Sequence, residues 1–239
     1  MTGLLYVVAT PIGNLEDISA RAIKVLSQVN RIAAEDTRHS SRLLQHLGIN
    51  TPLVAVHDHN EAGRVQSLIE QLVAGESIAL ISDAGTPLIS DPGYRLVAAA
   101  HQANIQVVPV VGACAAIAAL SAAGLPSDRF SFEGFLAAKT SQRQTQLKAL
   151  ANETRTLIFY EAPHRILECV QDMANIFGAD RRVVLARELT KTFETIKQST
   201  LAELCVFVES DSNQQRGEIV LVVDGAPEDS RLMAEQELD

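Results

Sequence analysis

Short apolar runs alternate with helical patterns along the first half of the chain. The run at 4–9 precedes apolar positions at helical spacing, and this order of strand and helix recurs four more times. The later predicted strands are RIAAE, LVAV, SIALIS and IQVVPV, and the predicted helices after them cover 40–47, 61–73, 94–103 and 113–123. Such alternation predicts a mostly parallel sheet with helices on both faces.

A stretch rich in glycine, proline and serine, GLPSDRFSFEG at 124–134, interrupts this rhythm. We therefore predict two α/β domains, residues 1–122 and 123–239. In the second domain, strands are expected at 155–161, 181–188, 193–197 and 217–225, and helices at 142–150, 165–177 and 201–208.

Composition is that of a soluble globular protein, with 239 residues of which 47% are hydrophobic. The longest apolar runs fall well short of the roughly 20 residues that span a bilayer, so no transmembrane helix is expected. The amino terminus has no basic segment typical of a secretory signal, and we expect a cytoplasmic protein. Cys114, Cys169 and Cys205 are widely spaced, which predicts reduced thiols and no metal site.

The net charge of −9 argues against a general nucleic-acid binder, because phosphate contacts need local lysine and arginine. The segment 139–148 has three basic residues and no acidic one. It is interpreted as a solvated helix face rather than an RNA patch.

Three loops of small residues follow predicted strands, at 9–14, 82–93 and 111–116. The chain lacks the glycine-rich motifs of dinucleotide-binding and P-loop proteins and the G-x-S-x-G motif of hydrolases, so another kind of site is needed. Each loop alone reads as an ordinary turn. Together, at the carboxyl ends of parallel strands, they predict a ligand site in which Asp83 binds a hydroxyl or an amine.

Longer strings run along nearly the whole chain in a characteristic order: TPIGNLEDIS, AAEDTRHS, HDHNE, SDAGTPLISDPG, FYEAPHR, ARELTKTFE and GEIVLVV. In order and spacing they resemble the ribosomal RNA ribose methyltransferase I family, which has the tetrapyrrole-methylase-like (class III) methyltransferase fold. One departure is Gly112-Ala113, where family members often have Gly-Pro.

The resemblance implies a C-terminal domain with a mixed sheet, and S-adenosylmethionine held in a cleft between the domains. Matching positions assign the cofactor contacts to Pro11, Asp83, Ala84, Thr86, Pro87, Cys114, Ala115, Tyr160, Glu161 and Leu189. For Tyr160 and Leu189, core packing is an equal alternative.

The implied reaction is 2′-O-methylation of a cytidine ribose in small-subunit ribosomal RNA, which needs phosphate contacts and a proton acceptor. The substrate contacts are assigned to Arg38, His164, Arg165 and Lys191, and the proton acceptors to His59 and Glu161. Arg38 could instead form a helix-start ion pair with Asp36. His57 and His59 could be a hydrogen-bonded surface pair.

Two other functions stay open at this point. The same fold could methylate a small molecule such as a tetrapyrrole, which the acidic net charge mildly favours. Alternatively, a non-catalytic sensor would bind S-adenosylmethionine without turnover. The expected partners are small-subunit ribosomal RNA, in the assembled subunit, and a second copy of the chain in a homodimer.

Overall fold

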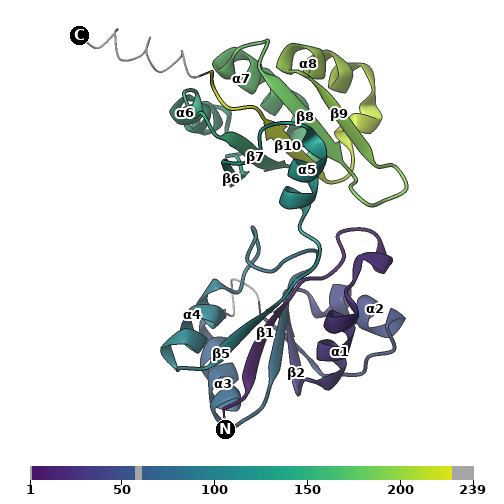
Figure 1. The fold of residues 1–239 in the computed structure, drawn as a ribbon, viewed down its shortest axis with the longest axis vertical. Helices are drawn as coiled ribbons and strands as arrows, with labels where there is room; N and C mark the ends of the chain where they lie inside the picture. The colour runs from purple at the N-terminus through teal and green to yellow at the C-terminus, as the bar shows by residue number, and fades with distance from the viewer. Residues whose placement is uncertain (1, 57–60, 228–239) are drawn as a thin grey trace, which may run out of the picture. The chain divides into compact units, whose positions relative to one another are not determined.

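Five short strands of the first half form one parallel sheet (Figure 1). The computed structural model describes residues 2–56 and 61–227, and the chain divides into two compact units, Met1–Cys114 and Ala115–Asp239. The strands of the first unit are β1 (Leu4–Val8), β2 (Arg31–Ala34), β3 (Leu53–Ala55), β4 (Ile78–Ile81) and β5 (Gln106–Val110). They are arranged in the order β3-β2-β4-β1-β5, and every pair is parallel.

Helices cover both faces of this sheet. Their bounds are α1 (Ala20–Gln28), α2 (Thr37–His46), α3 (Glu61–Val73) and α4 (Tyr94–Gln102), with a 3₁₀ turn at Leu15–Asp17. Successive residues of β2 point to opposite faces: Ile32 and Ala34 pack on the side of α1 and α2, and Ala33 on the side of α3 and α4. The prediction of a parallel sheet with helices on both faces is confirmed (Figure 1).

The second unit has a five-stranded mixed sheet in the order β6-β7-β10-β8-β9. Only β6 and β7 pair in parallel, and the other pairs are antiparallel. The elements are α5 (Ala115–Ala123), β6 (Phe130–Phe135), α6 (Thr140–Leu150), β7 (Thr156–Glu161), α7 (Ile166–Phe177), β8 (Arg182–Arg187), β9 (Thr195–Thr200), α8 (Leu201–Ser210) and β10 (Ile219–Val223), with 3₁₀ helices η2 (Pro163–Arg165) and η3 (Ser212–Gln215). The expected mixed sheet is therefore confirmed.

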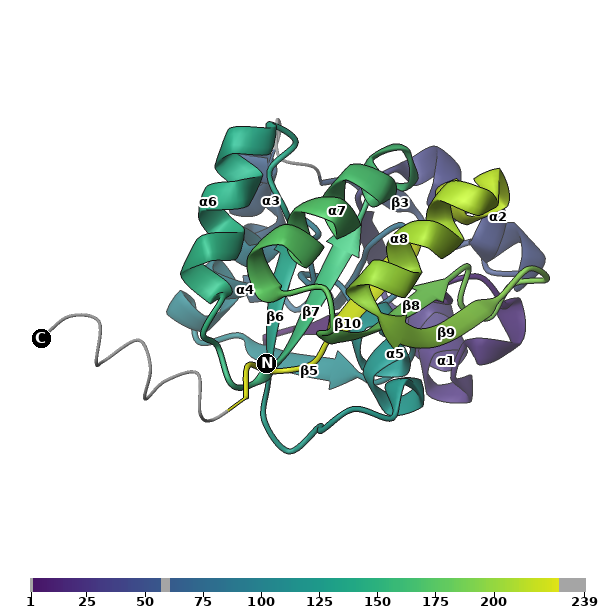
Figure 2. The same ribbon diagram turned by 90° about the horizontal axis from the view of Figure 1, so that it is seen from above.

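One face of the mixed sheet is covered by α6, α7 and α8, which lie next to one another above the strands in Figure 2. Phe159, Leu185 and Leu221 point to that side and are fully buried. Helix α5 packs on the strands β7, β8, β9 and β10. Each unit thus has its own apolar core.

Strand β6 was missed, because the stretch at 124–134 was interpreted as a break. The register of β6 against β7 shifts between Phe132 and Gly134, and Gly134 has a φ of +65°. A bulge of this kind interrupts the alternation on which strand prediction depends. Helix α5 belongs to the second unit, so the predicted boundary after residue 122 lies at the opposite end of that helix from the division at Cys114.

No helix in the described part of the chain is both long enough and apolar enough to cross a membrane.

Candidate functional site

Strands β1 and β4 are neighbours in the parallel sheet, and the connections that follow them run toward opposite edges of the sheet. β1 leads through α1 to β2, and β4 leads through α4 to β5. Helices α1 and α4 also cover opposite faces. Open parallel sheets bind ligands at the carboxyl edge where the connections diverge in this way. The loops at 9–14 and 82–93 therefore form the first candidate site.

Hydrogen bonds join the three small-residue loops into one assembly. The Thr10 N–H donates to the Gly85 carbonyl at 2.9 Å, and the Gly85 N–H donates back to the Thr10 carbonyl at 3.1 Å. Thr86 Oγ1 donates to the Ala113 carbonyl at 2.9 Å, which attaches the third loop. The structure thus brings together loops that lie far apart in the sequence.

The loop after β4 holds its backbone in conformations that favour glycine. The φ angle is +80° at Gly85, and it is also positive at two residues with side chains, +72° at Leu88 and +69° at Ser90. A residue with a side chain in this conformation lowers the folding stability by an amount of order 1–3 kcal/mol, and such strain concentrates at ligand-binding sites. The geometry is therefore consistent with a binding loop.

Three aspartates meet at this edge. The Asp36 N–H donates to Asp83 Oδ1 at 3.1 Å, which links the loops after β2 and β4. Burial raises the pKa of Asp91, and the charge of Asp83 raises it further, against a hydrogen bond with Ser82 that lowers it. Asp91 is a candidate that the sequence reasoning did not single out, although it stands in the SDAGTPLISDPG string.

The predicted cofactor residues of these loops differ in exposure. Pro11 and Pro87 are buried, so their rings fix the loop backbone, whereas Ala84 is exposed. The half-buried members are Asp83, Thr86, Cys114 and Ala115. Their assignment to a cofactor stays a prediction.

In the second unit, a buried ion pair follows β7. Arg165 Nη2 lies 2.7 Å from Glu161 Oε1, and their side chains are 17% and 1% exposed. Glu161 Oε1 also accepts the Ala162 N–H at 2.7 Å. Burial raises the pKa of the Cys169 thiol well above its usual range, and the neighbouring Glu161 charge raises it further. Glu161 thus lies between a guanidinium and a neutral thiol.

The turn after β8 lies at the same sheet edge, because Ile219 of β10 pairs with Glu161 on one side and Arg187 on the other. In this turn Lys191 Nζ lies 2.8 Å from Glu188 Oε1 and 3.0 Å from Glu218 Oε2. Burial alone lowers the pKa of Lys191, but these hydrogen bonds outweigh it and leave the pKa raised.

The backbone of this turn is fixed from several sides. The φ angle is +52° at Glu188 and +65° at Thr190, and Leu189 between them is buried. The buried Arg187 donates to the Phe193 carbonyl at 3.0 Å and to Gln214 Oε1 at 3.1 Å. Arg187 therefore holds the turn against η3.

Tyr160 connects the end of β7 with the start of α5. Its hydroxyl accepts the Ala116 N–H at 3.2 Å, and its ring packs edge-on against Phe132 and Phe135. The structure thus brings Tyr160 close to the predicted contact Ala115. The packing and the cofactor interpretations are both compatible with this position.

The other predicted substrate contacts are exposed. Arg38 has a side chain 90% exposed, and its Nη2 lies 3.2 Å from Asp36 Oδ2, so the helix-start ion pair that was the alternative for this residue is present. Hydrogen bonds from the side chain and backbone of Arg38 lower the pKa of Asp36 to about 2. His164 is exposed on η2. His57 and His59 lie outside the described residues.

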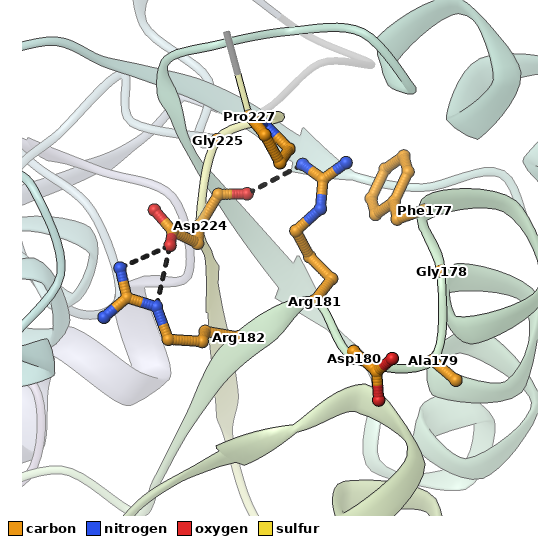
Figure 3. Close-up of a pocket in the computed structure, with 9 residues that line it drawn as sticks. All are labelled: Phe177, Gly178, Ala179, Asp180, Arg181, Arg182, Asp224, Gly225 and Pro227. Atoms are coloured by element: carbon orange, nitrogen blue, oxygen red, sulfur yellow. Dashed lines mark hydrogen bonds and ion pairs between the residues drawn. The ribbon is translucent and has the colours of Figure 1, made fainter. Parts of the chain in front are cut away.

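Within the described ranges, no group of three or more histidine, cysteine, aspartate or glutamate side chains could hold a metal ion. A separate hollow lies at the other edge of the mixed sheet, where β8 begins and β10 ends (Figure 3). Its cations are paired: Arg182 contacts the Asp224 carboxylate at 2.6 Å, and Arg181 donates to the Asp224 carbonyl at 3.1 Å. No motif in the sequence indicated this hollow.

Comparison with known proteins adds the chemical class. The profile of the family described as Tetrapyrrole (Corrin/Porphyrin) Methylases matches residues 4–205. The solved structure of uroporphyrin-III-C-methyltransferase from Thermus thermophilus is 21% identical with a TM-score of 0.64, covering 94% of this chain and 95% of that one. Diphthine synthase is 14% identical with a TM-score of 0.69, covering 93% and 90%. The fold and the profile define a methyltransferase of the tetrapyrrole methylase class.

Sequence relatives narrow the class. A protein of Pseudomonas aeruginosa named ribosomal RNA small subunit methyltransferase I is 64% identical over 228 residues, covering 95% of this chain and 81% of the relative. Proteins of the same name from Vibrio cholerae and Synechocystis are 58% and 52% identical, covering 93% and 99% of this chain and 77% and 84% of the relatives. The chain belongs to the family of ribosomal RNA small subunit methyltransferase I.

Proposed function

We propose that this methyltransferase transfers a methyl group from S-adenosylmethionine to the 2′-oxygen of a cytidine ribose in small-subunit ribosomal RNA. The observation that carries the proposal is the 64% identity, over 95% of the chain, to a relative whose name specifies ribosomal RNA of the small subunit. The choice of ribose oxygen and of cytidine rests on the resemblance of the sequence strings.

The loop assembly of the first unit fits the cofactor chemically. S-adenosylmethionine supplies an electrophilic methyl group on a sulfonium, and it offers ribose hydroxyls and an ammonium group to the protein. The half-buried Asp83 carboxylate suits a hydroxyl or the ammonium group, and small residues such as Ala84 and Gly112 leave the backbone accessible. Gly112 also packs closely, since a Cβ there would lie 2.9 Å from the Ala9 Cβ.

The full set of proposed cofactor contacts comes from both units. They are Pro11, Asp83, Ala84, Thr86, Pro87, Cys114, Ala115, Tyr160, Glu161 and Leu189. The first six of these residues belong to the first unit, and Ala115, Tyr160, Glu161 and Leu189 belong to the second.

Substrate binding is proposed for Arg38, His164, Arg165 and Lys191. Arg38 and His164 are exposed and suit direct contact with RNA. Arg165 and Lys191 are already paired with carboxylates, so each holds a turn at the edge of the mixed sheet as well as offering hydrogen-bond donors.

Two groups, His59 and Glu161, are proposed to assist the loss of the proton as the ribose oxygen attacks. Glu161 is 1% exposed and paired with Arg165, so proton uptake there requires the pair to open, and the geometry favours a positioning role. His59 is proposed as the direct acceptor. The chain is further proposed to act in the cytoplasm, as a homodimer and without a metal.

The test is transfer of labelled methyl from S-adenosylmethionine to small ribosomal subunits isolated without this modification, followed by nuclease mapping. A single label on one cytidine 2′-oxygen, resistant to alkaline cleavage, is the expected result. Label on a base, or transfer only to a tetrapyrrole acceptor, would overturn the proposal. Cofactor binding without any S-adenosylhomocysteine would indicate a sensor instead.

A further inference from the structure

Helix α2 presents a basic face on the side away from the sheet. Ser40 and Leu44 are buried against the first unit, and Leu44 belongs to its core. At 100° per residue, Arg38, Arg42, Gln45 and His46 point the opposite way, and all four are exposed. We call these four residues the outer face of α2.

The charge of this face contrasts with that of the whole protein. The net charge is −9, yet neither α1 nor α2 contains an aspartate or a glutamate. Arg38 is paired with Asp36, directly before the helix. Within the described parts of the chain, no carboxylate lies within ion-pair distance of Arg42. A cation without a neighbouring carboxylate is suited to bind an anionic partner.

The basic segment at 139–148 does not offer a comparable surface. Arg143 is 1% exposed in its side chain, and its Nε lies 2.6 Å from Asp172 Oδ2. It also donates to the Ala138 carbonyl. Arg143 therefore ties α6 to α7, and only Lys139 and Lys148 of that segment are exposed. The expectation of a wholly solvated basic helix face is wrong at Arg143.

The position of α2 relates its outer face to the candidate cofactor loops. Asp36 caps the helix by accepting the Arg38 N–H at 2.8 Å, and its own N–H donates to Asp83. The first turn of α2 is therefore anchored to the loop after β4. A strand of RNA that reaches this edge can continue along the outer face of α2.

We propose that the outer face of α2 binds phosphates of the RNA substrate, with Arg42 making one of these phosphate contacts. The inference rests on the proposed function and adds a binding surface to it. Contacts of this kind position the RNA backbone without reading its sequence. The polar, cationic character of the face suits a polyanion better than an apolar protein surface.

The experiment measures binding of the full chain to in vitro transcribed small-subunit ribosomal RNA at several salt concentrations. Loss of one phosphate contact reduces the slope of log K against log salt by about 0.7 for single-stranded RNA, and raises Kd about fivefold at 0.1 M salt. We expect this change for Arg42→Gln, with unchanged affinity for S-adenosylmethionine, because Arg42 lies more than one helical turn beyond Asp36, the residue that contacts the loop after β4.

Arg31→Gln is the matched control. Arg31 lies at the amino end of β2, the strand that leads into α2, and it forms an exposed ion pair with Glu76 at 3.7 Å. The substitution makes the same change in net charge as Arg42→Gln, at the end of β2 that lies away from α2. Its RNA affinity should stay within about twofold of the wild type, because it removes no phosphate contact.

Each other outcome overturns the inference. An unchanged salt slope for Arg42→Gln, or an equal loss for Arg31→Gln, would remove the outer face from the RNA contact while the proposed function stands. A loss seen only with assembled subunits would indicate a ribosomal protein as the partner. If the wild type binds and methylates no ribosomal RNA at all, the proposed function fails first and the inference fails with it.

Discussion

Among single residues, Asp83 offers the most direct test of the cofactor loops. Its carboxylate is half-buried and accepts one backbone N–H, which leaves further acceptor capacity. A hydrogen bond to a charged group contributes about 1.5–3 kcal/mol, so Asp83→Ala should weaken S-adenosylmethionine binding by roughly 10- to 100-fold. Isothermal titration calorimetry with S-adenosylmethionine measures this change in affinity. Asp83→Asn keeps an acceptor for the Asp36 N–H, and unchanged affinity in both variants would remove Asp83 from the site.

Arg165 is expected to affect stability as well as methylation. Its removal leaves the buried Glu161 carboxylate without its partner, which costs about 3–5 kcal/mol in buried pairs. Arg165→Ala should therefore unfold at lower urea concentration. It should also lose more RNA methylation than cofactor affinity, because its proposed contact is to the substrate.

The double variant Glu161→Gln/Arg165→Met separates charge from packing, because it leaves no ion unpaired. It should regain part of the lost stability. If the single variant Arg165→Ala is as stable as the wild type, the pair does not hold the turn. Equal losses of methylation and cofactor affinity would make Arg165 a structural residue.

Residue contacts close in sequence could be anticipated, and distant ones could not. The ion pair of Arg38 with Asp36 joins residues two apart in the sequence, and the pair of Arg165 with Glu161 joins residues four apart. Both pairs are therefore visible in the local pattern of charges. Arg143 and Asp172 are 29 residues apart, so their pairing depends on how α6 packs on α7. That packing is a tertiary property, and the local pattern of charges does not contain it.

At the scale of elements, Gly217 controls the turn after β8. Its φ is +81°, and a Cβ at this position would overlap the Glu188 carboxyl group, which holds Lys191. Gly217→Ala should therefore push the Glu188 carboxyl group away from Lys191 and destabilise the protein by at least about 1 kcal/mol, the ordinary cost of a side chain at positive φ. Thermal unfolding measures the loss of stability, and RNA methylation measures the effect on activity.

Gly48→Ala is the control for backbone strain alone. Gly48 has a φ of +69° with open space around its Cβ position. If the two alanine variants lose equal stability, then the contact with Glu188 contributes nothing. A larger loss for Gly217→Ala, together with reduced methylation, would support the role of this turn.

The elements that were predicted well have a clear period. The buried strands β4 and β10 read as continuous apolar runs, and α7 has an apolar stripe at helical spacing. Strand β9 was expected at 193–197 and lies at Thr195–Thr200. Its pattern of half-buried and exposed polar residues gives little signal, because one side of this edge strand faces solvent.

At the scale of the whole molecule, the proposed cofactor contacts come from two units with separate cores. Ligand at about 100 times its Kd should raise the free energy of unfolding by about 2.7 kcal/mol. We expect S-adenosylmethionine to slow amide hydrogen exchange both in the loops at 9–14 and 82–93 and near Tyr160 and Leu189. Protection confined to the first unit would exclude Tyr160, Glu161 and Leu189 from cofactor binding.

The fold class followed from the sequence because alternating strands and helices leave few arrangements. The strand order did not follow, and it is this order that brings the loops at 9–14 and 82–93 together.

The positive φ at Ser90 has a consequence for laboratory evolution of this enzyme. Glycine adopts this backbone conformation without the steric cost that serine bears, so Ser90→Gly offers a route to a more heat-resistant chain. A library selected only for thermal tolerance would enrich such a change. A library selected for turnover would retain the serine if the rigid loop sets the geometry of the methyl donor. Parallel selections would thus show, from one codon, whether the strain serves catalysis.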